Sequence, residues 1–175
     1  TEGEFTYKIR EVKGDLPGVI YDENEITATV KVTDKAGAKT AQVTYDRQAF
    51  TNTYKAAATS LVVKASKKLA GATLAADQFT FELVDKATGQ VVGTAKNKAD
   101  GSVEFPAVNY DAVGNHTYTI REKNEGAAGY TYDAKEVEVT VDVTDNGQGQ
   151  LVANATYSSE EGFTNTYKAA ATSLV

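Results

Sequence analysis

Three polar residues occupy positions where the alternation of a β-strand would carry them into an apolar core. Each stands two positions from aliphatic or aromatic residues: Lys67 from Ala65 and Leu69, Glu122 from Ile120, and Asn165 from Phe163 and Tyr167. Successive side chains of a strand point to opposite faces, so each polar group shares a face with apolar neighbours. Charged residues are almost never fully buried unless they are paired, and a buried carboxamide also needs partners. The three side chains are therefore candidates to meet one another.

The chemistry available to an amine, a carboxyl group and a carboxamide in an apolar core is amide formation. Desolvation lowers the pKa of a lysine and raises that of a glutamate, so the amine becomes a neutral nucleophile and the carboxyl group keeps its proton. Glu122 is expected to hydrogen-bond the carboxamide oxygen of Asn165, polarise the carbonyl and carry a proton to the departing ammonia. Well-oriented groups reach effective molarities of about 10⁵–10⁸ M. The predicted product is an isopeptide cross-link between Lys67 and Asn165, with Glu122 as the proton shuttle.

The chain contains an internal repeat. Residues 163–175 repeat residues 50–62 without a change, and residues 117–122 (Thr-Tyr-Thr-Ile-Arg-Glu) match residues 6–11 (Thr-Tyr-Lys-Ile-Arg-Glu) at all but one position. These matches predict tandem repeats of about 112 residues. Residues 1–56 are then the C-terminal half of one repeat, residues 57–168 a complete repeat, and residues 169–175 the start of the next. The chain is expected to be a segment of a tandem array.

The complete repeat has the pattern of short strands separated by turns. Apolar and polar residues alternate over residues 61–69, 79–84, 117–122, 137–143, 151–157 and 163–167. Asp100-Gly101 is a hairpin signal, Asn146-Gly147 begins a turn, and Gly71 is expected to end the first strand. No segment shows the period of a helix. The pattern predicts an all-β fold of the sandwich type.

The first, incomplete repeat has two of the three polar residues. Glu11 and Asn52 correspond to Glu122 and Asn165, but the strand that would carry the counterpart of Lys67 is missing from the chain. Half a sandwich exposes its core and its unpaired strand edges. We expect another chain, or a preceding segment, to supply the missing strands to residues 1–56.

Composition and charge exclude several classes of function. The 175 residues carry a formal net charge of −6, which disfavours nucleic acid and anionic membrane surfaces as partners. The absence of cysteine excludes a disulfide, a thiolate metal site and a cysteine nucleophile. No apolar run approaches the roughly 20 residues of a membrane span, so no membrane insertion is expected in this segment. The sequence has no phosphate-binding loop, metal-ligand cluster or nucleophile–histidine pair, so no cofactor, no metal and no enzyme with turnover is predicted.

Five motifs in the complete repeat carry a family resemblance. They are residues 67–71 (Lys-Lys-Leu-Ala-Gly), 78–83 (Gln-Phe-Thr-Phe-Glu-Leu), 99–105 (Ala-Asp-Gly-Ser-Val-Glu-Phe), 118–122 (Tyr-Thr-Ile-Arg-Glu) and 163–167 (Phe-Thr-Asn-Thr-Tyr). Together they resemble the isopeptide-linked pilin domains of Gram-positive surface proteins, such as streptococcal backbone pilins and related repeat adhesins. In that family a lysine before the Leu-x-Gly turn, a glutamate ending the Tyr-x-Ile-x-Glu strand and an asparagine of the last strand form the bond. Those motifs correspond here to Lys67, Glu122 and Asn165.

The resemblance implies an immunoglobulin-like β-sandwich with a mechanical role. It also implies an extracellular, cell-wall-anchored surface protein or pilus, in which neighbouring repeats of the same protein are the partners. The chain shows no sortase sorting signal and no recognisable pilin motif, which favours a stalk repeat of an adhesin over a polymerising pilin. The alternative on the same fold is a module that binds a host matrix protein or glycan on its loops, which an exposed aromatic patch on loops such as residues 110–115 would favour. Tyr110, Tyr130 and Tyr132 could form such a ligand patch, although the edges and loops of sandwiches commonly carry tyrosine.

Each of the three polar residues also has a simpler explanation that involves no reaction. Lys67 could extend its amine to solvent from a strand end, Glu122 could form an ordinary salt bridge, and Asn165 could bond only backbone groups. His116, the single histidine, is expected on a surface loop. A group of oxygen-bearing residues suggests calcium but does not fit the spacing of an EF-hand loop: Asp133, Asp142, Asp145 and Asn146.

Overall fold

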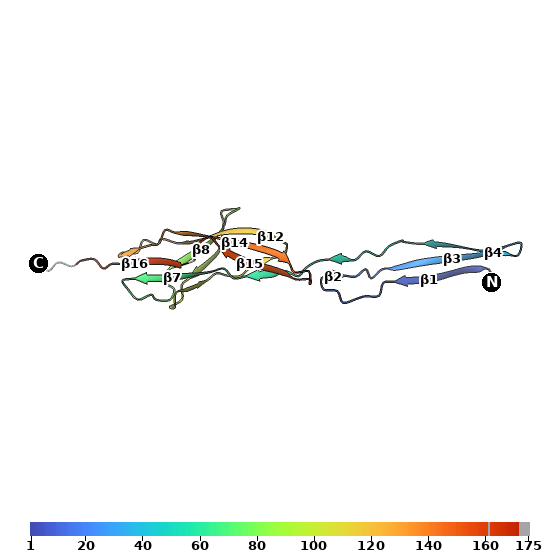
Figure 1. Ribbon diagram of the computed structural model, residues 1–175, viewed down its shortest axis with the longest axis horizontal. Helices are drawn as coiled ribbons and strands as arrows, with labels where there is room; N and C mark the ends of the chain where they lie inside the picture. Colours follow the sequence, from blue (N-terminus) through green and yellow to red (C-terminus); the bar gives the residue numbers. More distant parts are fainter. Residues whose placement is uncertain (161, 172–175) are drawn as a thin grey trace. The chain divides into compact units, whose positions relative to one another are not determined.

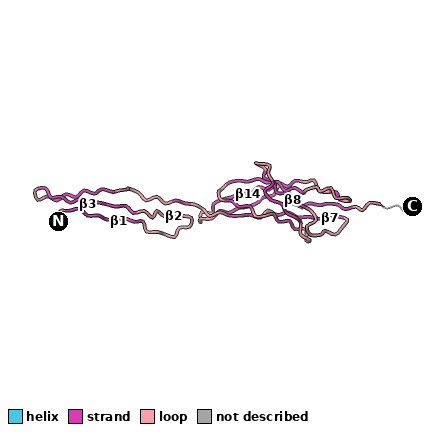
Figure 2. The backbone as a smooth tube through the Cα atoms, turned by 180° about the vertical axis from the view of Figure 1, so that it is seen from behind, coloured by secondary structure: helices cyan, strands magenta, loops and turns pink. Residues whose placement is uncertain are grey.

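The computed structural model describes residues 1–160 and 162–171 of the chain. This part consists of strands, turns and loops and contains no helix, which confirms the predicted all-β fold (Figures 1 and 2). It divides into two compact units, described separately below. Unit 1 comprises residues 1–57 with the turn at residues 147–150, and unit 2 comprises residues 58–146 with the residues from 151 onward. The described residues include no helix with the length and apolar character needed to cross a membrane.

Unit 2 contains strands β6 to β16. Their bounds are β6 Thr59–Leu61, β7 Lys64–Ala70, β8 Thr80–Asp85, β9 Val91–Lys96, β10 Ser102–Glu104, β11 Val108–Tyr110, β12 Gly114–Glu122, β13 Tyr130–Thr131, β14 Glu136–Asp145, β15 Leu151–Tyr157 and β16 Gly162–Tyr167. One sheet has the order β15-β14-β12-β8-β9 and a second has the order β10-β7-β16-β13. Strands β11 and β6 form a separate pair.

The two larger sheets of unit 2 pack face to face across an apolar core. Strand β14 shows why they do so: its alternate residues Val137, Val139, Val141 and Val143 are buried, whereas Glu136 is exposed. Such alternation gives a strand one apolar face, which must be covered by another sheet. Phe81 of β8 and Phe163 of β16 meet edge to face between the sheets, with their ring centroids 5.3 Å apart. Unit 2 is therefore a β-sandwich.

The first predicted strand of unit 2 is interrupted in the structure. Residues 61–69 were expected to be continuous, but β6 pairs with β11, whereas β7 pairs with β10 and β16. The prediction of one strand is wrong because the chain passes from one sheet to another between β6 and β7, at the fully buried Val63. Gly71 ends β7 as predicted, with a φ of 85° that favours glycine.

Unit 1 repeats part of this arrangement. Its strands are β1 Gly3–Arg10, β2 Val19–Ile20, β3 Glu25–Lys35, β4 Ala38–Tyr45 and β5 Thr53–Tyr54. They form the sheet β1-β3-β4 and the pair β2-β5. Tyr7 lies opposite Ala28 in the register of β1 and β3, just as Tyr118 lies opposite Val139 in that of β12 and β14. The strands of unit 1 therefore correspond to β12 to β16 of unit 2.

Unit 1 leaves exposed the side chains that unit 2 buries. Tyr7 and Ile9 of β1 are 56% and 41% exposed, whereas their counterparts Tyr118 and Ile120 of β12 are 3% and 0% exposed. Part of the cause is that β12 pairs with both β14 and β8, whereas β1 pairs with β3 alone. The other part is that a second sheet covers the apolar face of β12, whereas unit 1, as described, has only the short pair β2-β5 besides its own sheet. No strand corresponding to β7 to β11 packs on the described residues of unit 1. The predicted start of a further repeat, residues 169–175, lies outside the described residues from position 172 onward.

Candidate cross-linking site

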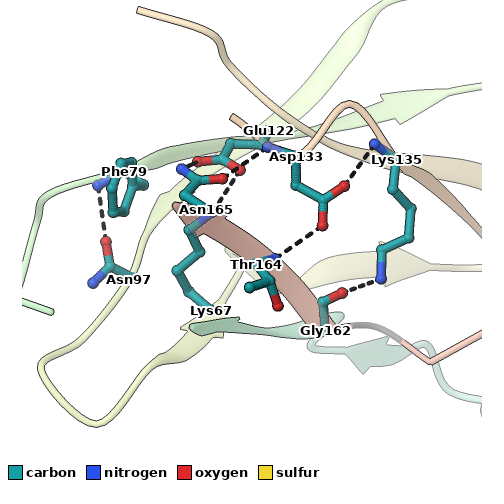
Figure 3. Close-up of polar contacts among 9 residues, drawn as sticks. All are labelled: Lys67, Phe79, Asn97, Glu122, Asp133, Lys135, Gly162, Thr164 and Asn165. Atoms are coloured by element: carbon teal, nitrogen blue, oxygen red, sulfur yellow. Dashed lines mark hydrogen bonds and ion pairs between the residues drawn. The ribbon is translucent and has the colours of Figure 1, made fainter. Parts of the chain in front are cut away.

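The three polar residues predicted to meet do so in the core of unit 2 (Figure 3). Lys67 Nζ donates a hydrogen bond to Glu122 Oε2 over 2.6 Å, and Asn165 Nδ2 donates to Glu122 Oε1 over 2.6 Å. The side chains of Lys67 and Glu122 are 0% exposed, and Asn165 is also fully buried. The carboxyl group of Glu122 thus joins the amine to the carboxamide. Lys67 does not extend to solvent, and Asn165 does not bond backbone groups alone.

Strand pairing brings the lysine and the asparagine together. β7 and β16 are parallel neighbours, in whose register Lys67 lies opposite Phe163 and Leu69 lies opposite Asn165. Along β7 the buried residues are Ala65 and Lys67, and along β16 they are Phe163 and Asn165. Glu122 comes from the end of β12 in the opposite sheet and reaches both side chains across the sandwich.

Aromatic rings exclude water from the lysine amine. Lys67 Nζ lies 4.6 Å from the ring centroid of Phe79 and 5.7 Å from that of Phe81. Phe79 is held by the buried Asn97, whose Oδ1 accepts a hydrogen bond from the Phe79 N–H over 2.8 Å. Asn97 Nδ2 in turn donates to the carbonyl oxygen of Ala75. Sequence reasoning did not identify Asn97, because no repeat or strand face distinguishes it from a loop asparagine.

Burial displaces the pKa values of the lysine and the glutamate in opposite directions. Desolvation lowers the pKa of Lys67 below its ordinary value of 10.5, although the hydrogen bond and charge of Glu122 oppose the shift. Desolvation also raises the pKa of Glu122 above 4.5, against the hydrogen bonds from Lys67 and Asn165. Both shifts favour the neutral amine and the protonated carboxyl group, the forms that amide formation requires.

The orientation of the carboxamide differs from the expectation. Glu122 was predicted to hydrogen-bond the oxygen of Asn165, but that prediction is wrong, because Glu122 accepts from the Asn165 nitrogen. The Asn165 oxygen instead accepts a hydrogen bond from the backbone N–H of Asp133 over 2.8 Å. A backbone N–H can only donate, so it requires the oxygen on its side and leaves the nitrogen facing Glu122. The hydrogen-bond donor to the carboxamide oxygen is therefore a backbone amide, and Glu122 faces the carboxamide nitrogen.

The Asp133 side chain holds this backbone amide in place. Its Oδ2 accepts from the Thr164 N–H over 2.9 Å, and its Oδ1 accepts from the Lys135 N–H over 3.0 Å. Partial burial acts to raise the pKa of Asp133, but these two N–H groups hold it below its ordinary value of 3.8. Lys135 Nζ also donates to the carbonyl oxygen of Gly162, at the start of β16 (Figure 3). The loop after β13 is thereby attached to the strand that carries Asn165.

Unit 1 contains the same arrangement without a lysine. Asn52 Nδ2 donates to Glu11 Oε1 over 2.6 Å, and the Asp22 N–H donates to Asn52 Oδ1 over 2.8 Å. Asp22 Oδ2 accepts from the Thr51 N–H, as Asp133 Oδ2 accepts from that of Thr164. The N–H groups of Thr51 and Asn24 lower the pKa of Asp22 to about 2. Sequence reasoning did not assign these aspartates to the site, although the matching dipeptides Tyr21-Asp22 and Tyr132-Asp133 could have drawn attention to them.

The tyrosines and the histidine considered in the sequence analysis pack within unit 2. Tyr110 is only 4% exposed, and its hydroxyl group lies 3.2 Å from the hydroxyl group of Tyr118. Tyr110 therefore offers almost no surface to a ligand. The rings of Tyr130 and Tyr132 pack on Phe79. The surface-loop prediction for His116 is wrong, because this residue lies within β12. No group of three or more acidic or histidine side chains placed to hold a metal occurs in the described residues.

The sandwich and the buried lysine, glutamate and asparagine between its sheets define an immunoglobulin-like domain with an isopeptide-type site. The family model described as FctA, Spy0128-like isopeptide containing domain, matches residues 1–55 and 63–168. The chain therefore belongs to this family, and the resemblance to pilin isopeptide domains is confirmed. The chain is thus a pilin-type structural domain, which indicates a surface or pilus protein. The comparison with curated proteins found no match.

Proposed function

We propose that this chain is a structural stalk or pilus segment of a Gram-positive surface adhesin, locked by a self-formed isopeptide bond between Lys67 and Asn165. The observation that supports it most is that Lys67 and Asn165 both bond to the Glu122 carboxyl group inside a dry core. An ordinary salt bridge requires only the lysine and the glutamate. A carboxamide whose nitrogen points at the same carboxyl group is what amide formation needs in addition.

The reaction follows from the positions of the three groups and of Asp133. In the reactive tautomer the Lys67 amine is neutral and Glu122 is protonated, the direction in which burial displaces both pKa values. Lys67 Nζ attacks Asn165 Cγ, while the Asp133 N–H stabilises the negative charge that develops on Oδ1. Glu122 gives its proton to Nδ2 and receives one from Nζ. The Cγ–Nδ2 bond breaks, ammonia leaves, and the new Nζ–Cγ amide remains.

A bond at this position suits a protein that carries mechanical load. β7 and β16 come from distant parts of the chain, and the cross-link would join them covalently in addition to their hydrogen bonds. Pulling force would then pass through covalent structure, and unfolding and proteolysis would be slowed. The bond forms once per chain, so the protein is not an enzyme with turnover. We infer that the units are tandem repeats of a cell-wall-anchored extracellular protein, with neighbouring repeats as their partners.

Intact mass spectrometry of the full chain tests this function. We expect the wild-type mass to fall below the calculated mass by one ammonia, and the Glu122→Ala chain to have its full calculated mass. Glu122→Gln keeps the size of the side chain and one acceptor oxygen but cannot transfer a proton, so it disturbs the core less than Glu122→Ala and helps to separate loss of proton transfer from loss of folding. Glu136→Ala replaces an exposed glutamate at the start of β14 and should leave the ammonia loss unchanged.

A wild-type chain at its full calculated mass would contradict the proposal. Lys67, Glu122 and Asn165 would then be a buried polar cluster that stabilises the core without reacting. Peptide mapping of the wild-type chain should show a branched peptide that contains Lys67 and Asn165. A branched peptide at another lysine would also contradict the assignment.

A further inference from the structure

Asn97 is a buried asparagine that takes no part in the proposed reaction. It comes directly after β9 and is only 1% exposed. Its Oδ1 accepts from the Phe79 N–H over 2.8 Å, and its Nδ2 donates to the carbonyl oxygens of Ala75 over 2.8 Å and Lys98 over 3.1 Å. A buried carboxamide is unfavourable unless its polar atoms are hydrogen-bonded, and these bonds use both its oxygen and its nitrogen. The carboxamide thus joins residues 75–79 to the residue that begins the turn before β10.

Both of the segments that Asn97 joins also contact Lys67. Residues 75–79 end in Phe79, whose ring centroid lies 4.6 Å from Lys67 Nζ (Figure 3). In the turn before β10, the Gly101 carbonyl oxygen accepts from the Lys67 N–H over 2.7 Å. Asn97 therefore connects the segment that covers the lysine amine to the turn that bonds the lysine backbone.

The position of the Phe79 ring affects how much water reaches the amine. Phe79 is 2% exposed, and the rings of Tyr130 and Tyr132 meet it edge to face, with centroids 5.7 and 5.9 Å from its own. An aromatic face also attracts a charged amine, but desolvation is the largest influence on the pKa of Lys67 and lowers it. A displaced ring would admit water to the amine and weaken that influence.

Asn97 holds the backbone from which this ring extends. Besides the side-chain bond, the Asn97 N–H donates to the Phe79 carbonyl oxygen over 3.3 Å, and the Asp77 N–H donates to the Asn97 carbonyl oxygen over 2.8 Å. These two main-chain bonds do not involve the carboxamide, so they can hold the loop when the side chain is shortened. The carboxamide adds the bond to the Phe79 N–H and the link to the turn before β10.

We propose that Asn97 is a positioning residue for the cross-link, whose carboxamide holds the Phe79 ring over the Lys67 amine and so keeps water from the amine before it reacts. This inference rests on the proposed function. The competing explanation is that Asn97 only attaches the loop to the rest of the fold. Loss of such an attachment lowers stability, whereas loss of a positioning residue also changes the surroundings of the amine.

The test follows ammonia loss by intact mass in freshly synthesised full chain at a series of pH values. In Asn97→Ala we expect the maximal rate to fall by about 10-fold, since a small misplacement of a reacting group can cost up to about 10²-fold. The pH range of maximal rate should also widen. The reason is that water at the site moves the pKa of Lys67 back toward 10.5 and that of Glu122 back toward 4.5.

Three further variants give the experiment its controls. Asn154→Ala replaces an exposed asparagine of β15 and should change neither the rate nor the pH range. Phe79→Leu removes the ring but keeps the N–H, and should reproduce both effects of Asn97→Ala. The double variant should react about as slowly as Phe79→Leu alone, because residues that act through one another are not additive. Among the described residues, Glu122 and Asp133 are the charged groups that act on the amine, and these variants change neither.

Each remaining outcome contradicts the inference. If the wild type loses ammonia and a folded Asn97→Ala chain matches its rate and pH range, the positioning role is refuted and the proposed function stands. A slower reaction over an unchanged pH range would mean that Asn97 only stabilises the loop. Effects that multiply in the double variant would show that Asn97 does not act through Phe79.

Folding of the variants is checked by circular dichroism. Asn97→Ser, which keeps a hydrogen-bonding side chain, takes the place of Asn97→Ala if the alanine chain is unfolded. If neither chain folds, Asn97 is required for the fold itself and the positioning role is contradicted. A wild-type chain that keeps its full calculated mass would refute the proposed function, and this inference with it.

Discussion

Glu122 is the residue on which the proposed chemistry of unit 2 depends, because its two oxygens have different partners. Oε2 accepts a hydrogen bond from the lysine amine, and Oε1 accepts one from the Asn165 nitrogen, which in the proposed reaction leaves as ammonia. In that reaction one carboxyl group could exchange protons between nucleophile and leaving group without moving. The Asn165 oxygen is left to the Asp133 N–H. The same division between a glutamate and a backbone N–H occurs at Glu11, Asn52 and Asp22 in unit 1.

Replacing Asp133 should slow bond formation without removing a reacting group. In Asp133→Ala the backbone N–H remains, but the carboxylate that attaches it to β16 is lost. A small misplacement of a reacting group can cost up to about 10²-fold in rate, so we expect bond formation to slow by about 10- to 100-fold. The measurement is the time course of ammonia loss in freshly synthesised chain, followed by intact mass.

Two further variants give this experiment its controls. Asp142→Ala replaces an exposed aspartate of β14 and should leave the rate unchanged. Asp133→Asn keeps one side-chain acceptor and should restore part of the rate. A wild-type rate in Asp133→Ala would show that the Asp133 side chain does not position the N–H.

The rate of bond formation should depend on pH at both ends of the range. In the reactive form the Glu122 carboxyl group is protonated and the Lys67 amine is neutral, so neither side chain is charged. The rate falls at low pH, when Lys67 becomes charged beside a protonated Glu122, and at high pH, when Glu122 loses its proton. Because burial raises one pKa from 4.5 and lowers the other from 10.5, the plateau should be narrower than the interval between those values. The width of this plateau is measured by following the rate of ammonia loss at a series of pH values. A rate that still rises above pH 10.5 would contradict the lowered pKa of Lys67.

Neighbouring strands and their turns set the position of the lysine. Strand β7 pairs with β16 and also contacts the hairpin turn before β10. The Lys67 N–H donates a hydrogen bond to the Gly101 carbonyl oxygen in that turn over 2.7 Å. Gly101 has a φ of 87°, and a Cβ added there would lie 2.3 Å from the carbonyl oxygen of Lys67. Glycine is required at this turn both for its backbone conformation and for the close approach to β7.

Gly101→Ala should therefore cost more than an alanine at an open turn. Gly89 has a φ of 71° with no atom within 4 Å of an added Cβ, so Gly89→Ala has only the backbone cost of about 1–2 kcal/mol. Gly101→Ala must also displace the backbone of β7, and we expect a loss of about 3 kcal/mol in the free energy of unfolding. Chemical denaturation in a Glu122→Gln background measures both variants without the cross-link. Equal losses would show that the turn moves away from β7 at no cost.

The two units differ in completeness, although they share a strand register. Unit 2 buries an apolar core between two sheets, whereas most of the described apolar side chains of β1 and β4 in unit 1 stay exposed. Hydrophobic burial is the dominant favourable term in folding, so unit 1 should be the less stable of the two. Local opening of weakly packed segments precedes proteolysis.

Limited proteolysis should accordingly begin in unit 1. The side chains of Arg10 and Lys13 are each 72% exposed and border the loop after β1, so trypsin should cut there first. Unit 2 should survive as a resistant fragment, and mass spectrometry of the products identifies it. First cleavage within β7 to β16 would contradict the stability difference that burial predicts. In Asn165→Ala, which lacks the proposed bond, the resistant fragment should be lost sooner.

The sequence predicted correctly that Lys67, Glu122 and Asn165 point into the core, because the face that a side chain takes depends only on its position within its own strand. A period of two places a residue on the apolar face of its strand whatever the strand later pairs with. The repeat in the sequence likewise located Glu11 and Asn52, since residues 6–11 and 50–54 match the segments that carry Glu122 and Asn165. The sheet class followed from the same alternation and from the turn residues between strands.

Contacts between distant segments decided the rest. The parallel pairing of β7 with β16, the burial of Tyr110 and the turn of the Asn165 carboxamide toward Glu122 all depend on segments far apart in the chain. Asp133 acts through a backbone N–H, which every residue except proline possesses, so its residue type could not reveal that role. Local periodicity specifies which face a side chain takes, but only the packed sheets specify which groups it meets there.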